Sequence, residues 1–309
     1  MKNRNDRMLL YIGMADAFAA ASEYLTGINE QFARYACLKF KCYCGHPTHG
    51  LRASYYTDDT EMSVANARVL IDGSAKELSP LVFVDSWLHE FKMGGQRKGY
   101  SKGFQNLLEK AKSGYELLRS ISPDSDKNGA AMRSVPFGVL PNIEELLRVA
   151  TFQAIITHNT PPATFSARAV ALMSHFALYE DAPFSELPEF CLENLPKNDV
   201  DAFGYIFRKL WTGDRVIGSK DTPVSIATVH AVVDLLLCQS SLMDILRKTI
   251  CWGGDTDSVA AIAWGIASAR YQNEKLPEFL ERDLENGSVE TGARYLRQVG
   301  FDLMEKYQP

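Results

Sequence analysis

Two short stretches of the sequence place several oxygen-bearing side chains within a few residues of one another. One is Tyr-Thr-Asp-Asp-Thr at residues 56–60, and the other is Gly-Gly-Asp-Thr-Asp-Ser at residues 253–258. Carboxylate and hydroxyl oxygens, with no histidine or cysteine in either stretch, match the ligand preferences of Mg²⁺, Mn²⁺ or Ca²⁺ better than those of zinc. Three donors from each stretch could hold two ions side by side.

Helix capping is the simpler explanation of the same residues. Each stretch precedes apolar residues at helical spacing, so each lies at a predicted helix N-terminus, where Asp, Ser and Thr are favoured. Capping accounts well for one aspartate per helix, but each stretch has two. If the carboxylates converged without a cation, a pair at roughly 4 Å would cost about 4 kcal/mol at an effective dielectric of about 20. Both explanations remain open, because spacing does not show that the stretches meet.

Helical periodicity dominates the rest of the chain. Further helical runs are predicted at residues 143–156, 166–178, 202–211, 225–238 and 242–251. Alternating strand-like runs are few, and Asn128-Gly129 is assigned to a loop rather than to a hairpin. Irregular segments are expected near residues 38–56, 93–103 and 121–141. Because no repeat and no long Pro- or Gly-rich linker divides the sequence, we expect residues 1–309 to form one all-α domain.

Composition restricts the class of protein. The 309 residues are 46% hydrophobic and carry a formal net charge of -5, which disfavours a broad nucleic-acid-binding surface. Six cysteines are too few for a disulfide scaffold and indicate a reducing compartment. The basic, apolar N-terminus is similar to a secretory signal, but Asp16 interrupts its apolar run. No segment has the roughly 18 apolar residues of a membrane span, so we expect a soluble, monomeric, cytoplasmic protein.

Taken together and in this order, the two aspartate stretches resemble those of the ADP-ribosylglycohydrolase family. The resemblance extends over about residues 10–287. Asp16 lies in a segment similar to the family's Gly-Asp-Ala-Leu-Gly motif, and Glu23 follows seven residues later, which would place both on one face of a first helix. Residues 128–133 and the Thr-His pair at residues 157–158 also resemble family segments. The resemblance implies an all-α fold, a compact orthogonal bundle of a dozen or more helices.

The resemblance also implies roles for individual residues. Two Mg²⁺ ions, or Mn²⁺ in their place, would be bound by Thr57, Asp58, Asp59, Asp255, Asp257 and Ser258. Glu23 would act near the scissile bond as an acid or base or as a gate, and Asp58 and Asp257 would support catalysis through the ions. The ADP-ribose moiety would be contacted by Asn128, Gly129 and His158.

The implied reaction is hydrolysis of the bond between the anomeric carbon of ADP-ribose and a modified side chain. The substrate would be an ADP-ribosylated protein or a small ADP-ribose conjugate, with a nucleic-acid base also open. The particular residues found within the motifs favour arginine over serine as the modified residue. Two alternatives remain. The first is a degenerate relative that binds ADP-ribose without turnover, because Ala15 and Ala19 replace family glycines. The second is a metal-dependent phosphohydrolase, because a site in which oxygen ligands hold two metal ions also suits that reaction.

A second cluster of metal-binding residue types contains Cys42, Cys44, His46 and His49. Such residues can bind zinc, but their spacings are shorter than those of a standard zinc finger and no second half lies nearby. The sequence therefore favours a loop beside the substrate cleft. Arg133 could pair with a phosphate or with a buried carboxylate, and we favour the structural pairing.

Overall fold

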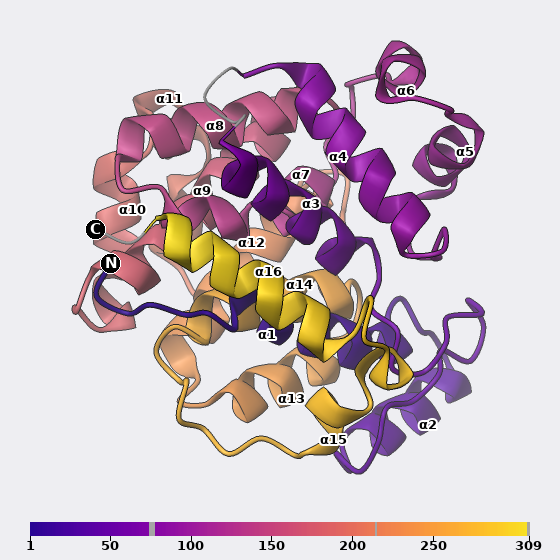
Figure 1. The fold of residues 1–309 in the computed structure, drawn as a ribbon. Helices are drawn as coiled ribbons and strands as arrows, with labels where there is room; N and C mark the ends of the chain where they lie inside the picture. Colours follow the sequence, from indigo (N-terminus) through magenta and orange to yellow (C-terminus); the bar gives the residue numbers. More distant parts are fainter. Residues whose placement is uncertain (74–77, 214, 308–309) are drawn as a thin grey trace.

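The computed structural model describes residues 1–73, 78–213 and 215–307, which fold into sixteen α-helices and several short 3-10 helices (Figure 1). No β-strand occurs in these ranges; two isolated bridges pair Asp124 with His158 and Val216 with Gly254. None of the described helices is both long and apolar enough to cross a bilayer. The predicted all-α bundle of a dozen or more helices is therefore confirmed.

The helices follow the chain in this order. The α-helices are α1 (Met8–Ala19), α2 (Ile28–Cys37), α3 (Asp58–Asp72), α4 (Pro80–Met93), α5 (Lys102–Lys110), α6 (Gly114–Ser120), α7 (Gly129–Met132), α8 (Ile143–Ile155), α9 (Pro161–Tyr179), α10 (Leu187–Asn194), α11 (Lys197–Phe203), α12 (Val224–Cys238), α13 (Leu242–Trp252), α14 (Thr256–Ala267), α15 (Phe279–Arg282) and α16 (Ala293–Lys306). The 3-10 helices are η1 (Ala20–Ser22), η3 (Val135–Val139), η4 (Phe184–Glu186), η5 (Gly204–Phe207) and η6 (Leu284–Gly287).

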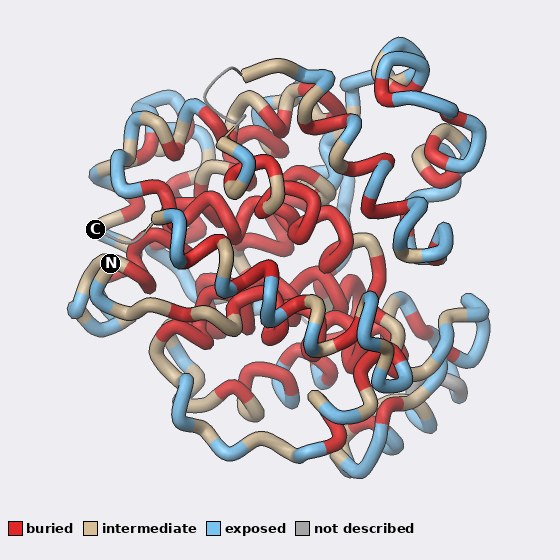
Figure 2. The backbone as a smooth tube through the Cα atoms, in the orientation of Figure 1, coloured by how far each residue is buried: buried red, intermediate tan, exposed pale blue. Residues whose placement is uncertain are grey.

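Helices α1 and α14 form the centre of the bundle. Every residue of both helices is buried, and Figure 2 shows the buried backbone concentrated in the middle of the molecule. Helices α3 and α16 pack on α1, and α12 and α13 pack on α14. Gly265 of α14 lies so close to α1 that a Cβ atom there would be 2.7 Å from Cγ1 of Ile12. The small residues of α14 thus allow this helix to pack closely on α1.

Most of the predicted helices are confirmed to within a few residues. The aspartate stretches precede α3 and α14, and the runs at 143–156, 225–238 and 242–251 correspond to α8, α12 and α13. Helix α9 begins at Pro161, earlier than the predicted residue 166. Two prolines open this helix, and proline is well suited to the first helical turn because that turn needs no intrahelical N–H donor.

The predicted helix at residues 202–211 is wrong. Helix α11 ends at Phe203, which has a φ of -127°, and Gly204 begins the single 3-10 turn of η5. Glycine loses much backbone entropy in a helix, so the apolar spacing alone does not extend α11 through this position. The loop assignment of Asn128-Gly129 is correct for Asn128, which lies in the turn before α7, and wrong for Gly129, which begins that short helix.

The expectation that Asp16 and Glu23 share one helical face is wrong as well. Helix α1 ends at Ala19, the 3-10 turn η1 follows, and Glu23 has an extended backbone with φ -63° and ψ 131°. The change of helix type and the extended residue redirect the chain. Asp16 therefore projects from the central helix, whereas Glu23 reaches the site from the segment that follows it.

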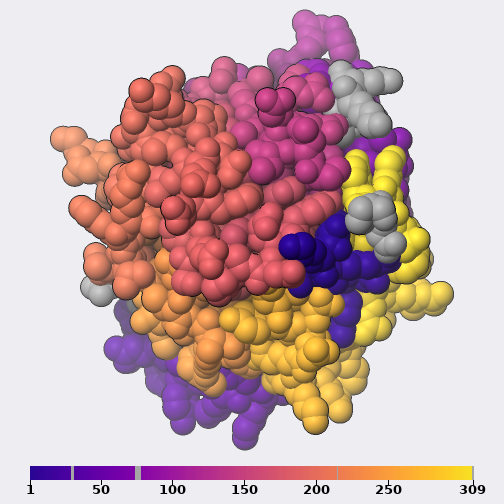
Figure 3. Space-filling model, turned by 90° about the vertical axis from the view of Figure 1, so that its left-hand side faces the viewer, coloured from indigo at the N-terminus to yellow at the C-terminus, as the bar shows by residue number. Residues whose placement is uncertain are grey.

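The N-terminal segment lies on the surface between the end of α9 and the C-terminal helix (Figure 3). The backbone N–H groups of Lys2 and Asn3 donate hydrogen bonds to the carbonyl oxygen of Leu178 at 3.0 and 2.9 Å. The side chain of Asn3 donates to the carbonyl oxygens of Ala177 and Glu180, both at 3.1 Å. These contacts fix the start of the chain beside α9 and lead it into the buried helix α1.

The close contact of α1 with α14 predicts the effect of one added methyl group. We expect Gly265→Ala to lower the free energy of unfolding by about 1–3 kcal/mol, because the new Cβ atom forces α1 and α14 apart. Urea-induced unfolding measures this change. The matched control is Gly103→Ala in α5, where a Cβ atom meets nothing within 4 Å and the variant should be unchanged or slightly more stable. Equal stability of Gly265→Ala and the wild type would contradict the packing argument.

Candidate functional site

The two aspartate stretches meet at one cavity of about 660 Å³. Its walls include Asp58 and Asp59 at the start of α3, and Asp255, Asp257 and Ser258 at the start of α14. Glu23, after α1, lines the same cavity. Five carboxylates from three separate parts of the sequence therefore face a common space, as the cation-site hypothesis requires.

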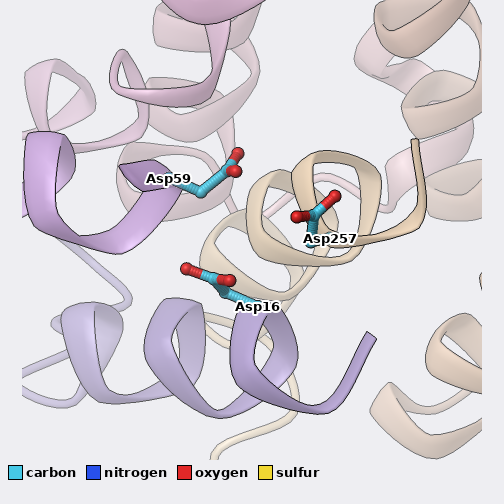
Figure 4. A group of neighbouring side chains, drawn as sticks. All are labelled: Asp16, Asp59 and Asp257. Atoms are coloured by element: carbon cyan, nitrogen blue, oxygen red, sulfur yellow. The ribbon is translucent and has the colours of Figure 1, made fainter. Parts of the chain in front are cut away.

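The carboxylates form two overlapping groups. Oxygens of Asp16, Asp59 and Asp257 lie within 4.8 Å of one another, and so do oxygens of Glu23, Asp255 and Asp257. Figure 4 shows the first group, in which side chains from α1, α3 and α14 converge. Asp257 belongs to both groups, so the arrangement offers two neighbouring positions for a cation with one shared carboxylate. The predicted ligand Asp58 lines the cavity but belongs to neither group.

Asp16 caps helix α3 from a distant part of the chain. Its carboxylate accepts hydrogen bonds from the backbone N–H groups of Thr57, at 3.0 Å, and of Thr60, at 3.1 Å. The hydroxyl groups of the same two threonines donate to it at 2.9 and 2.5 Å. These donors occupy both oxygens of Asp16 and satisfy the N–H groups that a helix N-terminus leaves unpaired. Thr57 is buried and contributes to this contact rather than to the cavity wall.

Capping does not explain most of the aspartates in the two stretches. Thr57 and Asp255 are the N-cap residues of α3 and α14, and neither makes a capping hydrogen bond through its side chain. Because Asp16 fills that role for α3, the carboxylates of Asp58 and Asp59 are not needed for it. Side-chain capping therefore does not account for Asp58 and Asp59, whereas Asp257 does accept the backbone N–H of Ser258 in the first turn of α14 at 3.0 Å.

Burial and mutual repulsion disfavour the ionised form of these carboxylates. Burial, and then the nearby carboxylates, raise the pKa of Asp58 to about 8 and place the pKa values of Asp59 and Asp257 well above their usual range. The Oδ1 atom of Asp59 is buried and has no hydrogen-bond partner among the described residues. An oxygen of this kind, beside further carboxylates, fits a ligand of a hard cation such as Mg²⁺.

Asp255 is held by three neighbouring segments. Its carboxylate accepts hydrogen bonds from the hydroxyl of Tyr24 at 3.0 Å and from Nδ2 of Asn128 at 2.9 Å. Its backbone N–H donates to the carbonyl oxygen of Val216 at 2.8 Å. The preceding residue, Gly254, has a φ of +83°, and a Cβ atom there would lie 2.3 Å from the same carbonyl oxygen. Glycine is therefore required for the tight turn into α14.

Glu23 faces the cavity from the segment after η1, and its side chain is 17% exposed. Burial, followed by the charges of Asp255 and Asp58, raises its pKa to about 9. Its backbone carbonyl accepts a hydrogen bond from Nε2 of His46 at 2.8 Å. A partly exposed carboxyl group that retains its proton near neutral pH is suited to general acid catalysis.

His158 also lines the cavity. The hydroxyl of Thr157 accepts a hydrogen bond from Arg133 at 2.7 Å and is hydrogen-bonded to Nδ1 of His158 at 2.6 Å. Burial and the charge of Arg133 lower the pKa of His158 to about 3, so its ring is neutral. A Cβ atom at Gly129 would lie 3.0 Å from Nε2 of His158, so glycine leaves room for the ring.

The cavity lining also includes apolar side chains that the motifs in the sequence did not identify. They include Tyr100, Phe104, Leu107, Ile121 and Met132. They come from the segment that carries α5 and α6 and from α7, at a distance in sequence from both aspartate stretches. The hydroxyl of Tyr24 and the capping role of Asp16 were missed for the same reason, because each depends on a contact between segments far apart in the chain.

The remaining candidates have structural partners. In His46, Nδ1 accepts hydrogen bonds from the backbone N–H groups of Thr48 and His49 at 3.1 and 2.9 Å. The ring proton is therefore on Nε2, which donates to the backbone carbonyl oxygen of Glu23. No cysteine or histidine of the described residues belongs to a group that could hold a metal. Arg133 is buried against neutral partners, Gln153, Thr157 and the ring of Trp87, so a buried carboxylate is not its partner.

Comparison with known proteins agrees with the fold. Residues 7–308 match the family model for ADP-ribosylglycohydrolase. ADP-ribosylhydrolase ARH3 of Mus musculus is 28% identical over 275 residues, which cover 75% of this chain and 73% of the relative. The human protein of that name is 26% identical over 277 residues, 75% of each chain. A solved structure described as an ADP-ribosylglycohydrolase-related protein complex has the same fold, with a TM-score of 0.72 at 20% identity over 99% of both chains. The chain therefore belongs to the ADP-ribosylglycohydrolase family of glycosyl hydrolases.

Proposed function

We propose that this protein removes ADP-ribose from a modified side chain with the help of two Mg²⁺ ions, for which Mn²⁺ can substitute. The observation that carries the proposal is the pair of carboxylate groups that share Asp257. Mutual repulsion among so many buried carboxylates is relieved most directly by divalent cations. The relatives named ADP-ribosylhydrolase support ADP-ribose as the group removed.

The residues proposed as metal ligands are those of the two stretches, namely Thr57, Asp58, Asp59, Asp255, Asp257 and Ser258. When bound, the ions would orient the ribose through its hydroxyl groups and stabilise charge near the anomeric carbon. Asp16 belongs to the first of the two carboxylate groups, and the threonines of α3 also donate hydrogen bonds to both of its oxygens. It holds the N-terminus of α3 and thereby the position of Asp58 and Asp59.

Glu23 is proposed to move the proton in the reaction. In its protonated form, Glu23 donates its proton to the leaving atom of the modified side chain as the bond between that atom and the anomeric carbon breaks. The resulting carboxylate then accepts a proton from the water that attacks the anomeric carbon, as in other glycoside hydrolases that pass through an oxocarbenium-like state. The raised pKa of Glu23 supports the first of these steps.

The remaining walls are proposed to bind the rest of ADP-ribose. The neutral ring of His158, beside Gly129, can hydrogen-bond to the substrate through Nε2 without adding charge. Asn128 positions Asp255 through its Nδ2 and keeps its side-chain oxygen for the substrate. The rings of Tyr100 and Phe104, which line the cavity with centroids 5.9 Å apart, suit a flat nucleobase, because aromatic rings stack on such surfaces.

The proposal is tested with ADP-ribosylated peptides modified on arginine or on serine, each incubated with Mg²⁺ or with EDTA. We expect free ADP-ribose and intact peptide only when Mg²⁺ is present. Binding without release would instead support a degenerate ADP-ribose-binding relative, an alternative that the complete set of carboxylates in the cavity disfavours. AMP or inorganic phosphate as the product would support a phosphohydrolase.

Replacement of Glu23 separates chemistry from binding. We expect Glu23→Gln to lower kcat by a factor of about 10²–10⁴, since the amide cannot transfer a proton, and to leave the affinity for ADP-ribose and Mg²⁺ nearly unchanged. Turnover and isothermal titration calorimetry measure the two effects. Glu290→Gln, a change at an exposed residue, is the matched control. Full turnover by Glu23→Gln would remove Glu23 from the mechanism.

The buried carboxylates also predict how stability depends on pH and metal. The pKa values of Asp16, Asp58 and Glu23 in the folded protein are raised to about 6, 8 and 9. Because these values exceed those of the unfolded chain, the stabilisation is complete below about pH 4 and is lost as pH rises through about 6–9. In EDTA, the Tm of the protein should therefore decrease as the pH is raised from about 5 to about 8.5, apart from the contributions of other groups.

Mg²⁺ should raise the Tm more at about pH 8.5 than at about pH 5, because the ion binds the ionised carboxylates. Differential scanning fluorimetry at both pH values measures the difference. Asp59→Asn should show a smaller dependence on both pH and Mg²⁺, because one of the mutually repelling carboxylates is gone. If Mg²⁺ raised the Tm equally at the two pH values, the carboxylates would not be its ligands.

A further inference from the structure

Three cysteines meet at the turn that follows α2. The helix ends at Cys37, and the backbone N–H of Phe40 donates to the carbonyl oxygen of Cys37 at 2.9 Å to close the turn. Phe40 has a φ of +47°, so the chain reverses sharply there. Cys42 and Cys44 lie on the returning segment, and this reversal brings them back toward the end of α2.

Two aromatic anchors hold the returning segment in place. The ring of Phe40 stacks on that of Phe18, with centroids 5.2 Å apart. The ring of Tyr43 packs edge-on against Phe279 at 5.6 Å, and its hydroxyl donates to the carbonyl oxygen of Leu280 at 2.5 Å. With Phe40 and Tyr43 fixed in the core, the sulfur atoms between and beside them have little freedom to move apart.

The three thiols form one hydrogen-bonded cluster with graded exposure. Cys44 accepts hydrogen bonds from the thiols of Cys37 and Cys42, and the bond from Cys37 contributes most to lowering the pKa of Cys44 to about 6. Cys37 is buried, Cys44 is partly buried and Cys42 is exposed. Cys44 is therefore a readily ionised thiol that a small oxidant can reach, with a second thiol behind it, which is the arrangement of a reactive cysteine.

We propose that Cys44 and Cys37 form a peroxide-sensitive thiol pair that regulates this enzyme. The thiolate of Cys44 attacks the O–O bond of a hydroperoxide and takes one oxygen as a sulfenic acid, while the other oxygen leaves as hydroxide or alkoxide and is protonated by solvent. The thiol of Cys37 then attacks the sulfur of the sulfenic acid. The S–O bond breaks, water leaves with the thiol proton, and a Cys37–Cys44 disulfide forms while the peroxide has been reduced by two electrons.

The thiol pair is connected to the catalytic site by a short segment of chain. His46, two residues after Cys44, donates through Nε2 to the carbonyl oxygen of Glu23 at 2.8 Å. Nδ1 of His49 lies 3.9 Å from the carboxylate of Glu23. A disulfide moves Cys44 toward α2 and pulls this segment, and Glu23 with it, away from its position. The effect on turnover rests on the proposed function, whereas the thiol chemistry does not.

The experiment uses the full chain, reduced and then treated with a small molar excess of hydrogen peroxide. Digestion without reduction, followed by mass spectrometry, should identify a Cys37–Cys44 disulfide. The exposed Cys238 and Cys251 should remain reduced under the same conditions and serve as internal controls. Turnover of an ADP-ribosylated peptide should be lost on oxidation and restored by dithiothreitol, and Cys44→Ser should be resistant to peroxide.

Two further variants test the order of the steps. Cys42→Ser should still form the disulfide, whereas Cys37→Ser should accumulate the sulfenic acid, detected by a dimedone adduct on Cys44. In case a variant fails to fold, the rate at which iodoacetamide labels each cysteine of the wild type provides a separate measurement, and Cys44 should react faster than Cys238 and Cys251.

The outcomes are distinguishable. Oxidation of Cys44 no faster than that of Cys238 or Cys251, or a disulfide that joins Cys44 to Cys42 instead, would overturn the proposed pair. A Cys37–Cys44 disulfide that leaves turnover unchanged would overturn the regulatory effect. If the reduced protein shows no turnover at all, the proposed function fails, and disulfide mapping still decides the thiol chemistry.

Discussion

The contact between Asp16 and the N-terminus of α3 is the constraint on which the site depends. A single buried carboxylate from the central helix receives two backbone and two hydroxyl donors from residues more than forty positions away. Charge-assisted hydrogen bonds of this kind are short and directional. They hold the first turn of α3, which carries Asp58 and Asp59, while the rest of the helix packs on α4 and α16.

The close packing of α1 on α14 completes the arrangement. Gly265 allows α14 to approach Ile12 of α1, and the same helix carries Asp257 at its N-terminal end. Asp16 and Asp257 therefore stand on two helices whose separation is set by small side chains, and α3 is attached to one of them through its cap. Three carboxylate-bearing helices are thus positioned by rigid helix contacts rather than by flexible loops, as a site with defined geometry requires.

The sequence predicted the parts of this structure that depend on local patterns. The helical spacing after Asp59 and Asp257 identified α3 and α14, and the oxygen-only composition of both stretches indicated a hard-cation site. These patterns did not predict the cap formed by Asp16, the hydrogen bond from the hydroxyl of Tyr24 to Asp255, or the place of Phe104 in the cavity lining. Each of these depends on where distant segments meet, which no local spacing encodes. The extended backbone at Glu23 was missed because a 3-10 turn and an α-helix have similar apolar patterns over so few residues.

The protein treats its structural carboxylates and its cavity carboxylates differently. Glu61 and Glu285 are buried and share the guanidinium of Arg97, at 2.6 and 2.7 Å, and Asp199 pairs with Arg168. Among the described residues, no lysine or arginine forms an ion pair with the carboxylates that line the cavity. A buried charge without a partner is strongly destabilising, so the cavity carboxylates must either keep their protons or receive positive charge from outside the chain. Burial and mutual repulsion raise the pKa of Asp58, Asp59 and Asp257, and the groups that share Asp257 could hold a metal ion.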